Sequence, residues 1–203
     1  MGYLRPISLG ALLALGHAPF NLWFLSIGAI CLCFLDIVKQ RKRSDIALYV
    51  MLLGIGYFIL TLNWIAEPFF VDFRSHAWIA PFAIFSISIA MAFFWGAFSY
   101  IFAPFGARWA LLLGIATAEY FRSFVLTGFP WGTIASLFVN SPLGQLLSIV
   151  GPFGLGLFIF VLVMYLIFLV ETKKFSSAVG GIFVLSLLFL WGFQRQNHEV
   201  FFT

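Results

Sequence analysis

The sequence has very little charge for its length. Its 203 residues include eleven Lys and Arg and seven Asp and Glu, together 9% of the chain, whereas 63% of the residues are hydrophobic. A soluble domain of this size needs a polar shell around its apolar core, and so few charged side chains cannot supply one. The mean hydropathy of +1.08 also lies well outside the range of soluble domains. The composition therefore excludes an ordinary soluble domain and predicts an integral membrane protein.

Cysteine and histidine are also scarce, which argues against a metal centre and a disulfide scaffold. The two cysteines, Cys31 and Cys33, lie two residues apart within an apolar run, a spacing that fits neither a metal knuckle nor a disulfide framework. The histidines, His17, His76 and His198, are scattered and have no second ligand at helical spacing. We therefore expect no metal site and no cofactor.

The formal net charge of +4 does not predict binding to nucleic acid. The basic residues stand in short clusters between apolar runs, as in residues 39–43. The loop topology of membrane proteins explains such clusters better than a nucleic-acid surface does. We therefore expect no nucleic-acid partner.

Long apolar runs dominate the rest of the chain. A transmembrane helix needs about 20 mostly apolar residues, because every backbone group must find a partner inside the hydrocarbon. This criterion divides the chain into about seven spans, and Gly151-Pro152 predicts a kink within the sixth. The predicted spans are about 5–16, 21–38, 46–65, 78–102, 108–125, 143–170 and 177–193. We therefore predict an all-α, polytopic membrane helix bundle that forms a single membrane domain over residues 1–203.

The positions of the basic residues predict the orientation of the bundle, since cytoplasmic loops carry an excess of Lys and Arg. Most basic residues fall on one side if the N-terminus is cytoplasmic. That side then holds Arg5, Lys39, Arg41, Lys42, Arg43, Arg108, Lys173 and Lys174, and the outer side holds Arg74, Arg122 and Arg195. We therefore predict a cytoplasmic N-terminus and a C-terminus on the outer side.

Glu119 and Arg122 are the first candidates for a functional role. They lie three residues apart near the end of the predicted span 108–125, so they share a helix face and can pair. Charges near the membrane interior face the bundle core or bind something polar. Two interpretations stay open: a structural ion pair, or an Arg122 side chain directed toward a lipid phosphate or toward a domain packed above.

Three less polar segments fall on the same predicted outer face. They are the turn that contains His17, the pair Asn63-Trp64, and an uncharged loop rich in glycine, proline and aromatic residues. The loop consists of Leu126, Thr127, Gly128, Phe129, Pro130, Trp131 and Gly132. Each segment alone is typical of an ordinary turn or helix end. Their convergence with Glu119 and Arg122 predicts a functional surface on that face, directed to lipid or to another domain.

In this order, the segments resemble the amino-terminal membrane half of bacterial apolipoprotein N-acyltransferase. The most specific piece is the acidic-aromatic-arginine helix end followed by the Thr-Gly-Phe-Pro-Trp loop. The matching pieces are Gly16-His17-Ala18-Pro19-Phe20, Asn63-Trp64, Glu119-Tyr120-Phe121-Arg122, Leu126-Thr127-Gly128-Phe129-Pro130-Trp131 and Gly151-Pro152-Phe153-Gly154-Leu155. The resemblance covers nearly the whole chain. It implies a multi-pass protein of the bacterial inner (plasma) membrane, whose outer side faces the periplasm.

The resemblance also implies a catalytic part that these residues do not include. In that family a nitrilase-like domain with a Glu-Lys-Cys set follows the seventh span, and an eighth span closes the chain. Its cysteine takes an acyl chain from phospholipid and passes it to the amino-terminal cysteine of a lipoprotein. The 203 residues stop about where the first strand of that domain would begin. Cys31 and Cys33 are poor substitutes, because both lie in an apolar run with no base nearby, so we expect no catalytic residue in this chain.

Two interpretations of function follow. In the first, the chain is the membrane domain of a truncated or split acyltransferase that is inactive alone. Its partners are then membrane phospholipid, a separately encoded nitrilase-like domain and apolipoprotein substrates. In the second, the chain is an independent small membrane protein, such as a transporter or an assembly factor, that reuses the scaffold. A transporter would expose a polar path at mid-membrane, whereas the charges predicted here lie mostly near the span ends.

Overall fold

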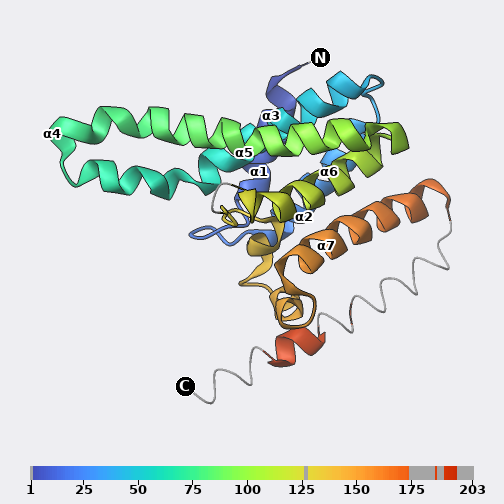
Figure 1. Ribbon diagram of the computed structural model, residues 1–203. Helices are drawn as coiled ribbons and strands as arrows, with labels where there is room; N and C mark the ends of the chain where they lie inside the picture. Colours follow the sequence, from blue (N-terminus) through green and yellow to red (C-terminus); the bar gives the residue numbers. More distant parts are fainter. Residues whose placement is uncertain (1, 126–127, 174–185, 187–189, 196–203) are drawn as a thin grey trace.

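The computed structural model describes residues 2–125, 128–173, 186 and 190–195. In this part of the chain the structure contains helices, turns and no β-strand, which confirms the predicted all-α class. The α-helices are α1 (Leu4–Ala14), α2 (Trp23–Ile37), α3 (Arg43–Thr61), α4 (Phe73–His76), α5 (Ala80–Phe102), α6 (Ala107–Arg122) and α7 (Leu147–Glu171) (Figure 1). The 3-10 helices are η1 (Asn63–Phe70), η2 (Ala77–Ile79), η3 (Ala103–Phe105), η5 (Ile134–Phe138) and η6 (Pro142–Leu146).

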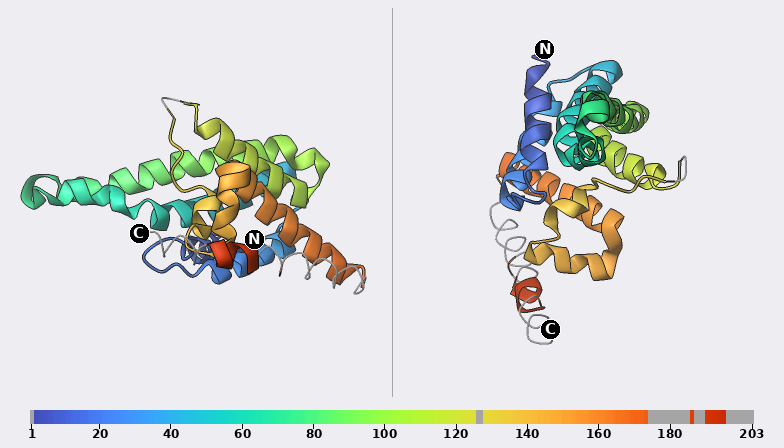
Figure 2. Two further views of the ribbon diagram at one scale, coloured as in Figure 1. Left: turned by 90° about the horizontal axis from the view of Figure 1, so that it is seen from below. Right: turned by 90° about the vertical axis from the view of Figure 1, so that its left-hand side faces the viewer.

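The helix α3 makes the most extensive helix–helix contacts of the bundle. It packs against α1 on one side and α5 on the other, and α5 packs in turn against α6. The helix α7 contacts α2, α6 and the two 3-10 helices η5 and η6 that precede it. Figure 1 shows α5 and the α3–η1 run projecting together beyond the other helices, with the short α4 at their tip. Figure 2 shows the same arrangement from two further sides.

Three helical stretches are long and apolar enough to cross a membrane. They are Arg43–Thr61, Phe73–Phe105 and Pro142–Glu171, and the two shorter helices α1 and α2 are also apolar. These stretches support a membrane protein, whereas the count of seven spans and the orientation stay predictions. The predicted span at 177–193 falls largely outside the described residues.

The boundaries of the observed helices differ from the predicted spans around residue 61. The predicted span 46–65 ends as an α-helix at Thr61, and the chain continues as the 3-10 helix η1 to Phe70. Pro68 lies inside η1 and has no backbone N–H to offer to an α-helical hydrogen bond. Short helical turns then lead through α4 and η2 into α5, so this connection is helical for most of its length.

Glycines allow α1 and α3 to approach each other closely. A Cβ atom on Gly10 would lie 2.0 Å from the carbonyl oxygen of Leu53, and one on Gly56 would lie 2.0 Å from the carbonyl oxygen of Ile7. Real Cβ atoms do not approach other atoms so closely, so only glycine permits this crossing. Small residues at helix crossings are the usual way for membrane helices to bring their backbones together.

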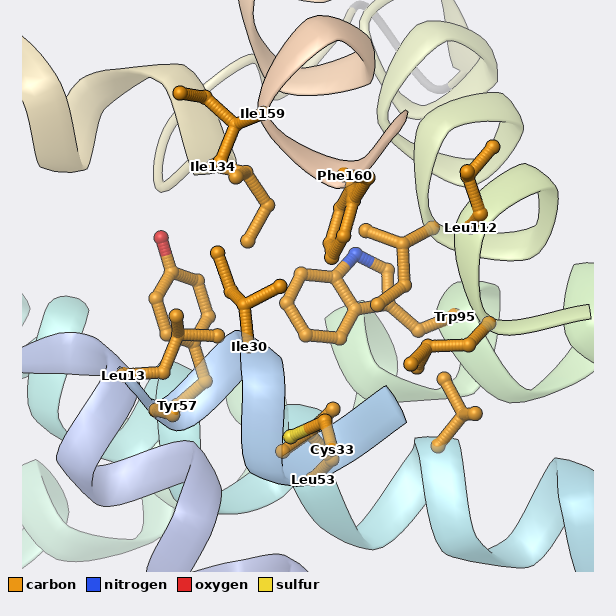
Figure 3. Close-up of a cluster of buried hydrophobic side chains, with 14 of the residues drawn as sticks. Leu13, Ile30, Cys33, Leu53, Tyr57, Trp95, Leu112, Ile134, Ile159 and Phe160 are labelled. Atoms are coloured by element: carbon orange, nitrogen blue, oxygen red, sulfur yellow. The ribbon is translucent and has the colours of Figure 1, made fainter. Parts of the chain in front are cut away.

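The core lies where these helices meet. Leu13, Leu53, Trp95, Leu112 and Phe160 come from five different helices and gather in one cluster (Figure 3). Trp95 is fully buried, and its ring stacks on that of Tyr57 with 5.2 Å between the ring centroids. Large interlocking aromatic and aliphatic side chains of this kind account for most of the packing contacts within such a bundle.

The predicted kink in the last long helix is present. Gly151 has backbone angles of φ 67° and ψ 178°, which are not helical, and Pro152 follows it. This combination of angles is accessible essentially to glycine alone. The kink separates the first turn of α7 from its long apolar part.

Candidate functional site

The charged pair of the sequence prediction lies on the last turn of α6 and is buried. Glu119 is 2% exposed and Arg122 is 1% exposed. The two side chains share a helix face, as their spacing predicts, yet their charged atoms form no ion pair within 4.0 Å in the described structure. Each side chain instead binds the loop that follows α6. In place of a direct ion pair, one of the two interpretations left open by the sequence, the structure shows two separate anchors of one loop.

The loop at residues 128–133 supplies the partners of this pair. Glu119 Oε1 accepts a hydrogen bond of 2.8 Å from the backbone N–H of Ile134, directly after the loop. Arg122 Nη2 donates to the carbonyl oxygen of Gly132 at 3.3 Å. Hydrogen bonds to charged groups contribute about 1.5–3 kcal/mol each. The pair therefore anchors the carboxyl-terminal end of the loop, at Gly132 and directly after it at Ile134.

Two further contacts complete the surroundings of Arg122. Its Nη1 lies 3.5 Å from Met91 Sδ on α5, and its Cζ lies 5.1 Å from the centroid of the Phe58 ring on α3. The ring face attracts the cation and replaces part of the water that Arg122 has lost. Arg122 is therefore enclosed by α3, α5 and the loop, and the structure directs it into the bundle instead of toward lipid.

Glycines shape the loop itself. Gly128 has a φ of 85°, and the N–H of Phe129 then donates to the Arg122 carbonyl at 3.0 Å. This bond satisfies a carbonyl at the end of α6 that has no partner within the helix. Gly132 has a φ of 64° and begins the return toward Ile134. Thr127, a predicted site residue, lies outside the described residues together with Leu126.

The remaining loop residues reach the surface near the end of α3. Pro130 is exposed, Phe129 is half-buried against the core, and Trp131 is 58% exposed. The ring of Trp131 packs edge-on against the ring of Trp64, with 5.9 Å between the centroids. The structure therefore brings together two segments that the sequence analysis placed on one face, the 128–133 loop and Asn63-Trp64.

A buried tyrosine connects the loop to His17. Tyr57 is fully buried, and its hydroxyl donates to the carbonyl oxygen of Thr133 at 3.2 Å. His17 Nε2 lies 2.8 Å from the same hydroxyl oxygen. Since the single hydroxyl proton is used on Thr133, the Nε2–H of His17 donates to Tyr57. No motif in the sequence marks Tyr57 as a site residue, although its position one helical turn before Thr61 on α3 places both hydroxyls on one face.

His17 lies in the turn between α1 and α2. Burial lowers the pKa of His17 to about 4, because the charged imidazolium would lose its water. The imidazole is therefore neutral at physiological pH, which suits its role as donor to Tyr57. Beside this turn a bond of 2.8 Å from the Ser26 hydroxyl on α2 to the Leu13 carbonyl on α1 joins the two helices.

A cavity of about 340 Å³ opens beside this turn, and we call it the His17 pocket. It brings together His17, Asn63 and Trp64, which the sequence analysis selected from two separate segments. Glu67 and Thr61 add a carboxylate and a hydroxyl that the analysis had not assigned to the site. The complete lining is Ala14, Leu15, His17, Ala18, Pro19, Phe20, Leu60, Thr61, Asn63, Trp64 and Glu67.

The residues of this pocket are suited to bind a molecule and not to react with it. Its apolar wall and few hydrogen-bonding groups suit an amphipathic molecule. The two thiols lie elsewhere, on α2, and Cys33 is buried in the core. In the part of the chain that the structure describes, no group of three or more His, Cys, Asp and Glu side chains is arranged to hold a metal ion. We find no nucleophile with an adjacent base among the described residues of the pocket.

Comparison with known proteins agrees with the features described so far. Residues 9–166 match the model of the apolipoprotein N-acyltransferase N-terminal domain. Over 154 residues the chain is 34% identical to the apolipoprotein N-acyltransferase of Caulobacter vibrioides, a match that covers 72% of this chain and 29% of that protein. The enzyme of the same name from Rickettsia prowazekii is 30% identical over 175 residues, 82% of this chain and 35% of that protein.

The protein from Rhodopseudomonas palustris, which carries the same name, is 31% identical over 160 residues, or 73% of this chain and 30% of the relative. The matched region thus spans about a third of the length of these curated relatives. More than half of this chain lies inside the matched domain, and that domain contains the helix end, the loop and the His17 turn. The chain therefore belongs to the apolipoprotein N-acyltransferase family and matches its amino-terminal domain.

Proposed function

We propose that the chain acts as the membrane domain of an apolipoprotein N-acyltransferase. The match of residues 9–166 to the amino-terminal domain of that family is the observation that carries this proposal. In this function the helices anchor the enzyme in the bacterial inner membrane. The 128–133 loop and the His17 pocket face the periplasm and hold a phospholipid or the domain that acts on it.

The geometry of the His17 pocket and the 128–133 loop supports the binding of a phospholipid or of another domain on this side of the bundle. The pocket is enclosed on one side by the α1–α2 turn and on the other by η1, and its floor is fixed to the loop through Tyr57 and Thr133. Trp64 and Trp131 present exposed rings beside it. Tryptophan rings favour the headgroup level of a bilayer, so these two rings suit a surface that contacts lipid.

We also propose that the acyl transfer itself depends on residues outside this chain. The described residues offer hydrogen-bonding groups but no nucleophile with a base, and transfer of an acyl chain to an amine needs such a set. A nitrilase-like domain of the kind that the family resemblance implies would supply it, whether joined to this chain or encoded separately. These 203 residues alone would then be inactive.

The other interpretation, an independent transporter or assembly factor, has no specific observation in its favour. Charged groups of the described structure lie around Glu119 and Arg122, around Asp36, at the Arg108–Glu171 ion pair, and in the segments 39–45 and 67–76. Between these places the core is apolar (Figure 3). A transport path would need polar groups there.

Complementation tests the proposed function. A bacterium is depleted of its own apolipoprotein N-acyltransferase, and this chain is expressed alone or together with the carboxyl-terminal two thirds of the Caulobacter relative. We expect mass spectrometry of lipoprotein amino termini to show no acylation with the chain alone and acylation with both parts. Acylation by the chain alone would overturn the proposed division of roles. Absence of acylation with both parts present in the membrane would contradict the membrane-domain function.

A further inference from the structure

A second polar cavity lies at the end of the bundle away from the His17 pocket. Its volume is about 400 Å³. It sits between the first turn of α1, the end of α2 and the first half of α3. The lining residues are Gly2, Arg5, Pro6, Asp36, Lys39, Gln40 and Tyr49. Neither the family match nor the proposed function uses this cavity.

Asp36 is the acidic residue of the cavity, and both of its carboxylate oxygens are already taken. Arg5 Nε lies 3.0 Å from Oδ2, and Lys39 Nζ lies 2.7 Å from Oδ1. The Asp36 side chain is 6% exposed, whereas those of Arg5 and Lys39 are more than half exposed. Two cations and one anion leave one positive charge at the mouth of the cavity.

The remaining lining groups are hydrogen-bond donors or can act as donors. The terminal nitrogens of Arg5 bind no acceptor in the described part of the chain, and the Gln40 amide also faces the cavity. The helix α1 begins here with no capping side chain and no acidic residue in its first turn. The N–H of Arg5 already donates to the Gly2 carbonyl and Pro6 has no N–H, so the contribution of this helix end to anion preference is its positive dipole.

Tyr49 provides an independent indication of a ligand. Its side chain is 1% exposed, yet its hydroxyl has no hydrogen-bond partner among the described residues. The thiol of Cys33 and the charges of Asp36 and Arg5 are its polar neighbours. A buried hydroxyl without a partner costs about 1–3 kcal/mol. Tyr49 lines the cavity, and an acceptor oxygen that reaches its hydroxyl would remove this cost.

We propose that this cavity binds the phosphate of an anionic phospholipid, with Arg5, Lys39 and Tyr49 as the donors. The basic cluster at residues 39–43 borders the cavity and attracts anionic headgroups to the same level. Arg5 and Lys39 are amphipathic side chains that reach the headgroup layer while their stems stay among apolar groups. The exposed apolar surfaces of α1 and α2 beside the cavity accommodate the acyl chains.

Native mass spectrometry of the full chain released from detergent tests this proposal. The probe is dioleoylphosphatidylglycerol, and dioleoylglycerol, which has the same acyl chains without the phosphate, is the comparison. We expect the chain to retain phosphatidylglycerol and not dioleoylglycerol. Lys39→Gln should weaken retention about tenfold, because it removes a charge-assisted bond, and Tyr49→Phe about fivefold.

Arg41→Gln is the matched control. It removes the same charge from the same cluster, but Arg41 is exposed and does not line the cavity. An equal loss of retention in Arg41→Gln and Lys39→Gln would overturn the proposal, because the cluster would then act only as a general positive surface. Unchanged retention in both Lys39→Gln and Tyr49→Phe would overturn it as well.

Glycerol phosphate distinguishes a lipid from a soluble phosphate ester. Displacement of phosphatidylglycerol by an equal concentration of glycerol phosphate would overturn the lipid assignment. Tyr49→Phe keeps the shape of the core, so its unfolding midpoint without lipid should equal or exceed that of the unchanged chain. Failure of this test would leave the complementation result untouched, because the two cavities lie at different ends of the bundle.

Discussion

A charged side chain in the interior of a bundle is tolerated only where fixed groups replace its water. Glu119 and Arg122 satisfy this condition through one loop and two helices. Glu119 balances the charge of Arg122 without a direct ion pair and also accepts a hydrogen bond from the N–H of Ile134. Loss of the charge balance and loss of the hydrogen bond each lower the stability of the fold, and the two losses can be measured separately.

Replacement of Glu119 separates these losses. We expect Glu119→Ala to lower the free energy of unfolding by about 3 kcal/mol, because Arg122 loses its buried counter-charge and the Ile134 N–H loses its acceptor. Glu119→Gln should cost about half as much, since the amide oxygen still accepts from Ile134. Equilibrium unfolding in detergent micelles measures the difference. Glu67→Gln, at an exposed carboxylate, is the control, and equal stability of all three variants would contradict the anchoring role.

Protonation of His17 provides a second test at this scale. Its folded-state pKa of about 4 lies below the unfolded value of about 6.5. The stability contributed by the neutral ring is therefore fully present above pH 6.5 and is lost as the pH falls toward 4. We expect the free energy of unfolding to decrease by on the order of 1 kcal/mol when the pH is lowered from 7.5 to 5. His17→Gln should show a flatter pH dependence, and an identical dependence in both proteins would refute this role of His17.

At the residue scale, spacing in the sequence predicted which side chains share a face but not what they contact. The separation of three residues placed Glu119 and Arg122 together on α6. Their partners Gly132 and Ile134 come from a loop, and Phe58 comes from another helix. Helical periodicity carries no information on such contacts, so the sequence left open whether the two residues pair with each other or bind other groups.

The close contact between α1 and α3 depends on two glycines. Gly10 and Gly56 each face a backbone carbonyl of the opposite helix. Neither position has a positive φ, so the requirement is for space and not for an unusual backbone conformation. The crossing also places Leu53 and Tyr57 in the core, where they meet residues from the other helices.

A larger side chain at this crossing should separate the helices. We expect Gly56→Leu to destabilise the fold by at least about 3 kcal/mol, because the added atoms meet the Ile7 backbone and cannot be accommodated by a side-chain rotation. Gly28→Leu on α2 is the matched control, since nothing lies within 4 Å of a Cβ at that position. Unfolding and size-exclusion profiles in detergent measure both variants. Comparable behaviour of the two would show that the close approach is not required.

The kink in α7 was predictable from the sequence because its cause is local. Pro152 removes a helical hydrogen bond, and Gly151 adopts backbone angles that other residues avoid. The end of α3 was less predictable. Apolar character continues beyond Thr61, so a hydropathy criterion extends the span, whereas the backbone changes there from α-helical to 3-10 geometry.

The orientation of the whole molecule is a prediction that labelling can test. Cysteines are introduced at Arg41 and Ser75, both exposed, and intact cells are treated with a membrane-impermeant thiol reagent. We expect Ser75→Cys to react and Arg41→Cys to react only after the cells are permeabilised, because the excess of basic residues places the 39–43 segment in the cytoplasm. The unchanged chain, with Cys31 and Cys33 only, provides the background. The reverse labelling pattern would invert the predicted topology.

The two polar cavities lie at opposite ends of helices α1 and α2. The His17 pocket lies at the turn between α1 and α2, and the cavity with Asp36 lies where α1 begins and α2 ends. If the predicted orientation holds, the first faces the periplasm and the second the cytoplasm. The proposed periplasmic role and the proposed lipid site then concern different leaflets of one membrane.

The sequence by itself determined that the helices lie in a membrane, that the fold is all-α, and to which family the chain belongs. Composition excludes water as the medium of these helices, the length of the apolar runs favours helices, and the order of short motifs is sufficient to indicate the family. Each of these is a local or additive property of the chain. The tertiary structure alone decided which groups Glu119 and Arg122 hold, which glycines touch a neighbouring backbone, and which residues surround each cavity. These contacts join segments that are distant in sequence, and they depend on how all the helices pack at once.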